Sequence, residues 1–568
     1  MARVTGAALT GKALINEGVK AIFTLCGSLG AIYDTCNDGG IELIGMRHEQ
    51  ATANAATGYA QVSGEPGVAM VTSGPGVINM FPGMAAAMNT HTPVIGICCH
   101  AVYCYEGMGV LQEFDAKDAY RSVTKWIGYC TSTRRIPEYM AQAFRYADTG
   151  RKGPVLVDIT DDALMLSIEE EHAPIIPPES YRTTARPYGD PELVKKATKM
   201  LLEAKRPAML VGTGILRADA SEELVQFAEF TQIPVCCAIG GKSAIPDDHP
   251  LNGGPIGYSF SSISGADVLL AVGVRFEDVL GFGKGDLYAP DVKVISVDIE
   301  PTEIGRNRPI ALGIYADAKA VLVQLLESAK ELTRGSKREE TDWVKTVQSI
   351  AQTVQTTLTS DMPREKKPID PRVLGKEVCD FLGRDSYIVM DGGDINAHVT
   401  PLFNATFPGS FLSALGGSLG HLGGGIPFAI GVKTAKPDKK VCVIEGDGSF
   451  LLNGSEIDTA VRNKKPIVVV ISNDCQWGMV RHAQQLAENK DLCSKLSEDV
   501  RYDKYAESLG AYGELVTEPG EIRPALQRAF DSGLPAVLDV RTDPDVMCFM
   551  NYLGPQLKDQ ILALYGEI

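Results

Sequence analysis

The stretch VCVIEGDGSFLLNGSEIDTAVRNKKPIVVVISND, residues 441–474, predicts the fold of this chain. The apolar run VCVIE is followed by GDGS at residues 446–449 and by helical periodicity over Asn453–Lys464. A second apolar run, IVVVIS, then ends at Asn473-Asp474. Two short apolar runs separated by a helix are typical of parallel strands joined by a crossover helix. The stretch therefore predicts a parallel α/β sheet.

Two carboxylates directly follow these strands, Asp447 after the first and Asp474 after the second. Because the carboxyl ends of neighbouring parallel strands meet at one edge of a sheet, both side chains are expected to lie together at the edge where α/β sheets bind ligands. Carboxylate oxygens are ligands that Mg²⁺ prefers, and Gly446 and Gly448 let backbone N–H groups approach a diphosphate. An Asp-Gly turn alone is common without a ligand, so the strand–helix–strand spacing carries this prediction.

The rest of the chain repeats the alternation of short apolar runs and helical stretches, and 568 residues exceed what one hydrophobic core holds. We expect domains at 1–175, 190–333 and 372–545 and a C-terminal tail at 546–568, with linkers rich in proline and charge at 169–191 and 361–371. Strands are predicted near Val19–Cys26, Gly67–Thr72, Pro93–Cys98 and Pro154–Ile159, then Pro207–Val211, Pro234–Ala238, Val268–Val272 and Val292–Val297, and finally Ser386–Met390, Val441–Ile444, Ile467–Ile471 and Ala536–Val540.

A second motif lies about 400 residues upstream, where IELIGM leads into Arg47-His48-Glu49-Gln50 and the alanine-rich stretch ATANAATGYAQVSG. The alanine content predicts a helix that begins near Glu49. A glutamate also favours the first turn of any helix through the helix dipole, so this position alone does not define a site.

Together the two motifs resemble those of thiamine diphosphate enzymes, in which GDG is followed some two dozen residues later by an Asn-Asn strand end. The resemblance implies an α/β fold of three parallel-sheet domains, namely pyrimidine-binding, middle and diphosphate-binding. It implies that Asp447, Asp474 and the main-chain carbonyl of Gln476 bind Mg²⁺. The family usually has Asn where Asp474 stands. Glu49 matches the glutamate that activates the cofactor through a hydrogen bond to its pyrimidine ring.

Further positions are carried over from the same resemblance. The segment TSGPGVIN, residues 72–79, is similar to the turn that faces the pyrimidine, and Leu422 stands where a bulky residue supports the bent cofactor. Gln112 aligns with a glutamine that points at the substrate. The predicted cofactor-binding residues are Thr72, Gly76, Asn79, Gly393, Leu422, Gly446, Gly448, Ser449, Trp477, Gly478 and Met479, and the predicted catalytic residues are Glu49, Gln112, Ser28 and His421.

Nearly the whole chain resembles the branch that contains benzaldehyde lyase, acetolactate synthase and 2-hydroxyacyl-CoA lyase. This implies a C–C bond lyase or carboligase acting on 2-hydroxy ketones, aldehydes or 2-keto acids. The loop around Ser28 lacks the histidine of benzaldehyde lyase, so the resemblance does not determine which of these substrates the enzyme uses. A 2-hydroxyacyl-CoA lyase is an alternative. It would need basic residues that bind a nucleotide, and the tail supplies just one lysine, Lys558. A catalytically silent member is a second alternative, against which the retention of Glu49, Asp447 and Asp474 argues.

The middle domain is a candidate site for FAD or ADP, since Gly212 and Gly214 follow one strand and Asp298 ends another. Both features also occur in α/β domains that bind nothing. In this family the glutamate and the metal motif meet across a subunit interface, so the resemblance implies a homodimer or homotetramer with shared active sites.

Composition excludes several other classes of protein. The net charge of −17 argues against a nucleic-acid binder, and no stretch is long and apolar enough for a transmembrane helix. The 13 scattered cysteines fit a reduced, cytoplasmic protein better than a disulfide framework. Cys98, Cys99, His100 and Cys104 lack a second pair that would complete a zinc site. We therefore expect a soluble enzyme whose partner is a small carbonyl compound.

Overall fold

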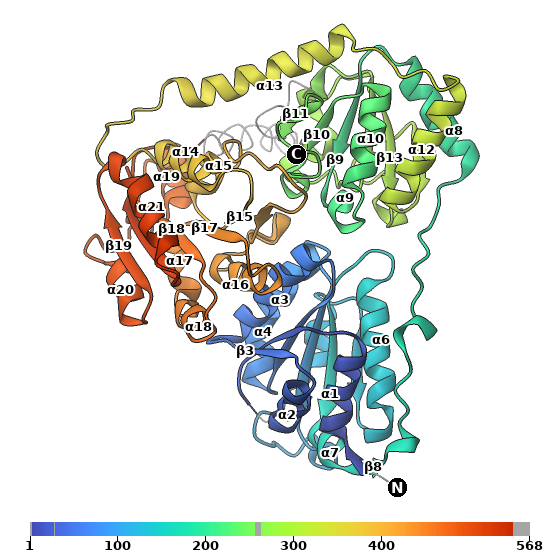
Figure 1. Ribbon diagram of the computed structural model, residues 1–568, viewed down its shortest axis with the longest axis vertical. Coiled ribbons are helices and arrows are strands. Elements are labelled where there is room, and N and C mark those ends of the chain that lie inside the picture. Colours follow the sequence, from blue (N-terminus) through green and yellow to red (C-terminus); the bar gives the residue numbers. More distant parts are fainter. Residues whose placement is uncertain (1–2, 28, 256–262, 549–568) are drawn as a thin grey trace, which may run out of the picture.

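A computed structural model describes residues 3–27, 29–255 and 263–548 of the chain. It contains three sheets of six strands, and every strand pair within these sheets is parallel. Helices cover the sheets, so that three α/β domains surround a common centre (Figure 1). The predicted fold class is confirmed.

The N-terminal sheet has the strand order β3-β2-β4-β5-β7-β6. A short antiparallel ribbon of β1 (Arg3–Thr5) and β8 (Ser167–Glu169) closes this domain. Its other elements are β2 (Ala21–Thr24), β3 (Glu42–Gly45), β4 (Gly67–Val71), β5 (Val94–His100), β6 (Ile127–Cys130), β7 (Val155–Thr160), α1 (Gly6–Asn16), α2 (Gly30–Asp38), α3 (Glu49–Ser63), α4 (Pro75–Asn89), α5 (Ala116–Tyr120), α6 (Ile136–Asp148) and α7 (Asp161–Met165).

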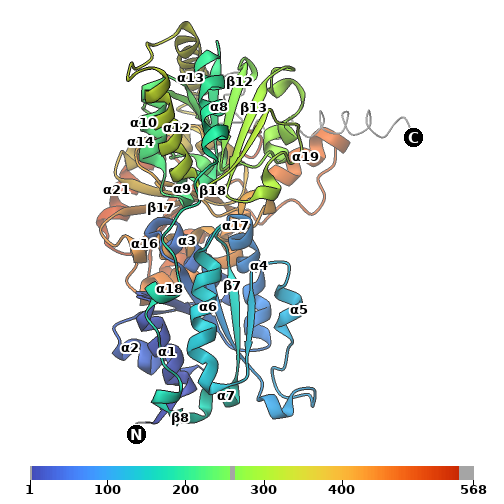
Figure 2. The same ribbon diagram turned by 90° about the vertical axis from the view of Figure 1, so that its right-hand side faces the viewer.

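The middle sheet has the order β11-β10-β9-β12-β13-β14. The segment between β8 and α8 reaches it along the outside of the molecule (Figures 1 and 2). The elements are β9 (Pro207–Val211), β10 (Val235–Cys237), β11 (Asn252–Pro255), β12 (Val268–Val272), β13 (Lys293–Asp298), β14 (Leu312–Tyr315), α8 (Pro191–Glu203), α9 (Thr213–Arg217), α10 (Ser221–Thr231) and α12 (Ala318–Leu332).

The C-terminal sheet has the order β16-β15-β17-β18-β20-β19. Its elements are β15 (Ser386–Met390), β16 (Phe411–Ser413), β17 (Lys440–Gly446), β18 (Val468–Asn473), β19 (Tyr512–Val516), β20 (Ala536–Arg541), α14 (Pro371–Leu382), α15 (Asp394–Val399), α16 (Gly425–Ala435), α17 (Asp447–Asn453), α18 (Glu456–Arg462), α19 (Gly478–Glu488), α20 (Tyr502–Ser508) and α21 (Ile522–Asp531).

One long helix, α13 (Asp342–Ser360), connects the middle and C-terminal domains (Figure 1). Near its start, Trp343 Nε1 donates to the Pro207 carbonyl of the middle domain, and near its end Gln355 Nε2 donates to the Pro401 carbonyl of the C-terminal domain at 2.6 Å. Only Val344 and Val347 of the helix are buried.

The strand predictions succeeded in the interior of each sheet and missed its edges. All predicted strands are inner strands of the three six-stranded sheets. The unpredicted ones are the edge strands of these sheets, β3, β6, β11, β14, β16 and β19, and the two strands of the short ribbon, β1 and β8. The helix expected over Asn453–Lys464 differs: helix begins at Asp447 and is interrupted at Gly454, giving α17 and α18. Most of the expected tail, residues 549–568, lies outside the described residues.

Helices α3 and α16 join the N- and C-terminal domains and lie side by side at the centre of the molecule (Figure 1). A Cβ atom added at Gly58 would lie 2.3 Å from the Phe428 carbonyl oxygen, and one at Gly431 would lie 2.0 Å from that of Ala55. Since only glycine fits at both positions, the two backbones approach closely and fix helix α3, which begins at Glu49, against the C-terminal domain.

Among the described helices, none combines the length and the apolar character needed to cross a bilayer.

Candidate active site

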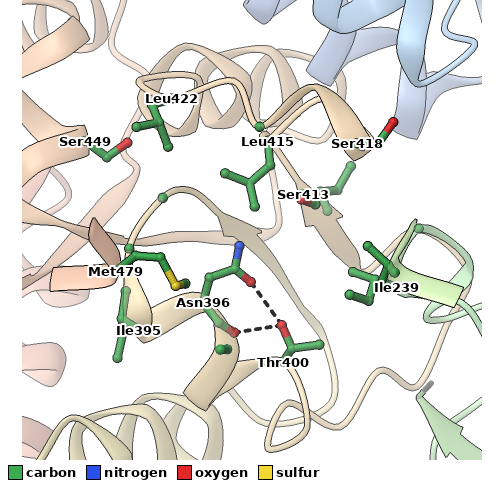
Figure 3. Close-up of a pocket in the computed structure, with 18 of the residues that line it drawn as sticks. Ile239, Ile395, Asn396, Thr400, Ser413, Leu415, Ser418, Leu422, Ser449 and Met479 are labelled. Carbon is green, nitrogen blue, oxygen red and sulfur yellow. Dashed lines mark hydrogen bonds between the residues drawn. The ribbon is translucent and has the colours of Figure 1, made fainter. Parts of the chain in front are cut away.

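A pocket of about 540 Å³ lies at the carboxyl ends of the C-terminal strands and is lined by all three domains. The C-terminal domain contributes the segments that follow β15, β17 and β18, and the middle domain those that follow β9, β10 and β12. Figure 3 shows Leu415, Leu422 and Met479 of the C-terminal domain around this space, with Ile239 of the middle domain opposite. The position agrees with the edge at which parallel sheets bind ligands.

The structure gathers the predicted cofactor and metal residues of the C-terminal domain in this pocket. Strands β17 and β18 pair in parallel with Gly446 opposite Ser472, which brings their carboxyl ends together as the sequence predicts. The residues of the prediction that line the pocket are Gly393, Leu422, Gly446, Asp447, Gly448, Ser449, Asp474, Gln476, Trp477, Gly478 and Met479.

Asp447 and Asp474 form a pair of carboxyl groups in which Asp447 is buried and Asp474 is half-buried. Asp447 is 1% exposed, and neither of its oxygens has a hydrogen-bond partner among the described residues. Burial, and then the charge of Asp474, raise the pKa of Asp447, while burial and the charge of Asp394 raise the pKa of Asp474. Gln476 Nε2 donates to Asp474 Oδ2 at 3.0 Å. Such a pair is costly without a counter-charge, so its oxygens fit a divalent cation.

Glycines keep the space beside these carboxylates open. A Cβ at Gly478 would lie 2.7 Å from Asp474 Oδ2 and 2.9 Å from Asp394 Oδ2, and one at Gly448 would lie 2.7 Å from the Trp477 ring. Gly393 has a φ of 105°, which favours glycine. Because these glycines have no side chain, the N–H groups of the local backbone are accessible to a diphosphate.

The predicted residues of the N-terminal domain form a separate group. Asn79 Nδ2 on α4 donates to Glu49 Oε2 at 3.0 Å, and Glu49 is the first residue of α3. Thr72 Oγ1 donates to Gln112 Oε1 at 3.4 Å, and a Cβ at Gly76 would lie 2.8 Å from the Thr72 methyl carbon. None of these side chains lines the pocket of the same chain. Ser28 lies outside the described residues.

His421 precedes α16 and faces α3 rather than the pocket. Its Nε2 lies 3.0 Å from Asn54 Nδ2 and 3.4 Å from Gln50 Nε2. Because an amide NH2 group can only donate, this nitrogen accepts, and burial lowers the pKa of the ring. His421 is thus a neutral histidine at the junction of the N- and C-terminal domains. Its two partners, Gln50 and Asn54, follow Glu49 in helix α3.

Other polar residues of the pocket were not predicted. Asp394 follows β15 and pairs with His482, whose Nδ1 lies 2.7 Å away. Arg217 and Arg275 line the pocket from the middle domain, and Arg275 NH1 pairs with Glu277 at 3.1 Å. Arg217 contacts only Thr90 O and Thr92 Oγ1 in the part of the chain that the structure describes, both at 3.4 Å. Arg217 belongs to the motif GTGILR and Arg275 to the motif VGVRFED, but only the fold shows that the two arginines line one pocket.

Of the three residues predicted to form a nucleotide site in the middle domain, one lines the pocket and two do not. Gly212 lines the pocket, whereas Gly214 packs so closely on Gly273 that its Cβ would lie 2.5 Å from the Gly273 Cα. Asp298 lies outside the pocket and accepts from Glu300 N at 2.8 Å, and burial raises its pKa to about 6.

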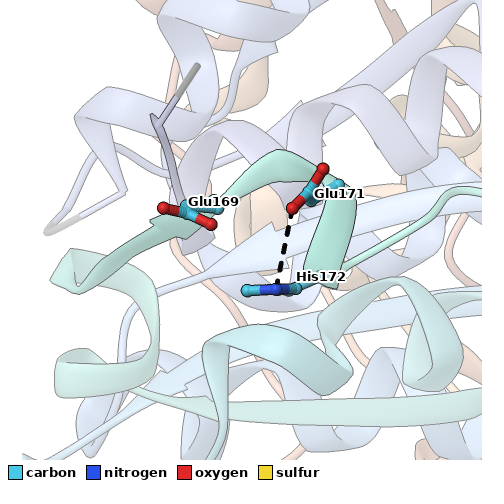
Figure 4. A group of neighbouring side chains, drawn as sticks. All are labelled: Glu169, Glu171 and His172. Atoms are coloured by element: carbon cyan, nitrogen blue, oxygen red, sulfur yellow. Dashed lines mark ion pairs between the residues drawn. The ribbon is translucent and has the colours of Figure 1, made fainter. Parts of the chain in front are cut away.

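Two further clusters lie away from the pocket. Cys98 Sγ and His100 Nδ1 contact the buried Asp158 at 3.3 and 3.1 Å. Glu169, Glu171 and His172 lie together at the base of the N-terminal domain (Figure 4). The His172 and Glu171 side chains are 55% and 58% exposed, so water solvates them and they indicate no reaction centre.

Comparison with known proteins covers all three domains. The chain matches models of the thiamine pyrophosphate enzymes: the N-terminal TPP binding domain over residues 4–119, the central domain over 194–325 and the C-terminal TPP binding domain over 391–540. It is 36% identical to a probable acetolactate synthase large subunit of Methanocaldococcus jannaschii, over 94% of this chain and 91% of that protein. It is 32% identical to an acetolactate synthase large subunit of Mycobacterium tuberculosis, over 95% and 96% of the two chains.

Replacing Asp447 by Asn is expected to stabilise the cofactor-free protein at pH 8. The pKa of this carboxyl is raised above its unfolded value of about 4, so the folded state binds a proton that the unfolded state releases, and stability falls as the pH rises above that value. The gain should be about 1–3 kcal/mol at pH 8 and vanish near pH 4. Thermal unfolding in EDTA measures it. As a control, Asp385→Asn at an exposed position should leave the free energy of unfolding unchanged. If Asp447→Asn is no more stable than wild type at pH 8, the explanation by the raised pKa is wrong.

Proposed function

Because the chain belongs to the thiamine pyrophosphate-dependent enzymes, we propose that it is an acetolactate synthase-like carboligase. A 2-keto acid would lose CO2, and its remaining acyl group would be joined to the carbonyl carbon of a second molecule, whose carbonyl oxygen takes up a proton. The observation that carries this proposal is the pair of the buried Asp447 and the half-buried Asp474 beside a glycine-lined backbone, in a chain that is similar over most of its length to acetolactate synthase large subunits.

Asp447, Asp474 and the main-chain carbonyl of Gln476 would hold Mg²⁺, which neutralises the two carboxylates and the diphosphate. The N–H groups around Gly446–Ser449 would bind diphosphate oxygens, and Leu422 would support the rings. When bound, thiamine diphosphate supplies a carbon nucleophile that attacks a carbonyl and accepts the electron pair of the broken C–C bond. Asp474 carries a charge where the family usually has Asn, so we expect tight metal binding.

Glu49 would donate a proton to the pyrimidine nitrogen, with Asn79 holding its carboxyl group in place. Gln112 would orient the substrate carbonyl. Glu49 does not line the pocket of its own chain, so a second copy must supply it. Apolar side chains flank both half-sites: Ile78 beside Asn79, Leu111 (88% exposed) beside Gln112, and Leu451 and Leu452 on α17. Exposed apolar surface of this kind is typical of an interface. We therefore propose a homodimer, or a homotetramer built from it.

The middle-domain side of the pocket would hold the diphosphate of FAD or ADP. The guanidinium of Arg217 makes no ion pair with a described carboxylate, and burial lowers its pKa to about 10. A half-buried cation without a counter-charge favours an anionic ligand. Gly212 and Gly240 leave room beside it in the pocket wall.

Replacing Glu49 by Gln tests the proposed chemistry. Turnover with Mg²⁺ and thiamine diphosphate should fall at least about 100-fold, because the amide does not exchange a proton with the pyrimidine. A panel of pyruvate alone, pyruvate with an aldehyde, benzoin and 2-hydroxyacyl-CoA measures it. Ligation of pyruvate supports the proposal. Cleavage of only benzoin or only the CoA ester would assign the chain to the benzaldehyde lyase or 2-hydroxyacyl-CoA lyase alternative, and no turnover to a silent member.

Mixed dimers test whether the active site is shared. A dimer of one Glu49→Gln chain and one Asp447→Asn chain should keep about half of the wild-type activity, since one of its two sites is then intact. A dimer in which one chain carries both substitutions and the other is wild type should be nearly inactive. Differently tagged chains allow both dimers to be purified, and the reverse pattern of activities would place each site within one chain.

Arg217→Ala tests the nucleotide site. We expect calorimetric titration of the protein with FAD and, separately, with ADP to show binding of at least one, weakened about 10-fold or more in this variant by loss of a charge-assisted contact. Arg186→Ala is the control, because Arg186 pairs with Asp317 elsewhere in the middle domain. Equal affinity in wild type and Arg217→Ala would remove the proposed role.

A further inference from the structure

The loop that leads into Glu49 is held by a residue of another domain. The chain leaves the N-terminal sheet after Met46, whose N–H still donates to the Thr24 carbonyl. The next two N–H groups, of Arg47 and His48, both donate to the carboxylate of Glu456. The distances to Glu456 Oε1 are 3.0 Å from each nitrogen, and Arg47 N also lies 3.2 Å from Oε2. Glu456 is the first residue of α18 in the C-terminal domain.

Glu456 does not act as an ordinary first-turn residue of its own helix. Its carboxylate is 0% exposed and is used by Arg47 N, His48 N and Thr459 Oγ1, the last at 2.6 Å. Burying a carboxylate costs free energy, and burial raises the pKa of this group to about 7 although the bonds from Thr459, Arg47 and His48 lower it. A helix start needs no such burial, since an exposed acid serves it as well. The arrangement indicates a role for the loop that Glu456 binds.

That loop determines where Glu49 stands. His48 is the N-cap of α3, with Nδ1 accepting from Gln50 N, so Glu49 follows a backbone that is fixed on both sides. Two anchors then act on Glu49: Asn79 holds its carboxyl group from the N-terminal domain, and Glu456 holds the backbone before it from the C-terminal domain. Only the second anchor lies across the domain junction.

We propose that Glu456 is a positioning residue that orients the cofactor-activating Glu49 by binding the Arg47 and His48 N–H groups. The inference rests on the proposed function of Glu49. Glu456 begins α18, which follows α17 and its first residue Asp447 directly in the chain, so it connects this part of the C-terminal domain with the glutamate of the N-terminal domain.

The neighbouring residue Asp458 offers a matched control. It lies on α18, and the polar partners of its carboxylate among the described residues are two side chains, Arg462 Nε at 2.7 Å and Arg47 NH1 at 3.8 Å. The Arg47 side chain is 58% exposed, so this outer pair is solvated and weak. Asp458→Asn therefore removes a carboxylate from the same turn without disturbing the loop N–H groups.

The test measures proton exchange at the reactive thiazolium carbon of thiamine diphosphate bound to the Mg²⁺-loaded protein, by quench and NMR in D2O without substrate. Glu456→Gln removes the negative charge, and its NH2 group replaces Oε2, which accepts from Arg47 N at 3.2 Å and from Thr459 Oγ1 at 2.6 Å, so that a donor then faces the Arg47 N–H group. We expect it to slow exchange about 10- to 100-fold, the effect of misplacing an activating group. Thiamine diphosphate affinity by calorimetry should change less than about threefold, and Asp458→Asn should match wild type.

The outcomes separate this inference from the proposed function. If Glu49→Gln slows exchange while Glu456→Gln does not, or if Asp458→Asn slows it as much as Glu456→Gln, the role of Glu456 is overturned and that of Glu49 stands. If Glu49→Gln leaves exchange unchanged, both fail. If Glu456→Gln does not fold, Glu456→Asp is used instead. Its side chain keeps the charge but is one methylene shorter, so its carboxylate lies farther from the two N–H groups, and the same slowing of exchange is expected. Unchanged exchange in the folded Asp variant would also overturn the proposal.

Discussion

The placement of two carboxyl groups side by side, the buried Asp447 and the half-buried Asp474, is the constraint on which the rest of this molecule depends. Like charges in a medium of low polarity repel each other and lose hydration, so the fold must supply a counter-charge or hold a proton there. The parallel pairing of β17 with β18 brings the two groups to one sheet edge. Gln476 orients one of them, and the glycines at 448 and 478 leave space in front. A site built this way fits a cation together with an anionic ligand, which is the basis of the proposed Mg²⁺ and diphosphate site.

Sequence patterns predicted the interior of each sheet and missed the edges for a physical reason. An inner parallel strand such as β18 is buried on both faces and reads as a continuous apolar run, VVVISN. An edge strand is paired on one side only. β11 reads NGGP and β19 reads YGELV, with mixed polarity and glycine, and such stretches do not differ from loops until the neighbouring strand is known.

The same limit applies to the site. The positions of the GDG segment and of the strand end at Asp474 could be predicted because one crossover helix joins two adjacent parallel strands there, which brings their carboxyl ends together. Arg217, Arg275 and Asn89 reach the pocket only through the packing of three domains, and no local pattern reports that. Glu456 reads as a common acidic residue at a helix start, and only its contacts with Arg47 and His48 distinguish it. Glu49 was predicted from its motif, and in one chain it lies apart from the pocket that it would serve.

Helix α13 helps to set the spacing between two of the domains that line the pocket. Its 19 residues span about 28 Å, and hydrogen bonds fasten it to the middle domain near Trp343 and to the C-terminal domain near Gln355. The two domains also bond each other directly, since the N–H groups of Ala405 and Gly409 donate to Asp247 and to Ser243 of the middle domain. The helix and these bonds together keep the pocket wall that the middle domain supplies at a fixed place opposite the C-terminal strands.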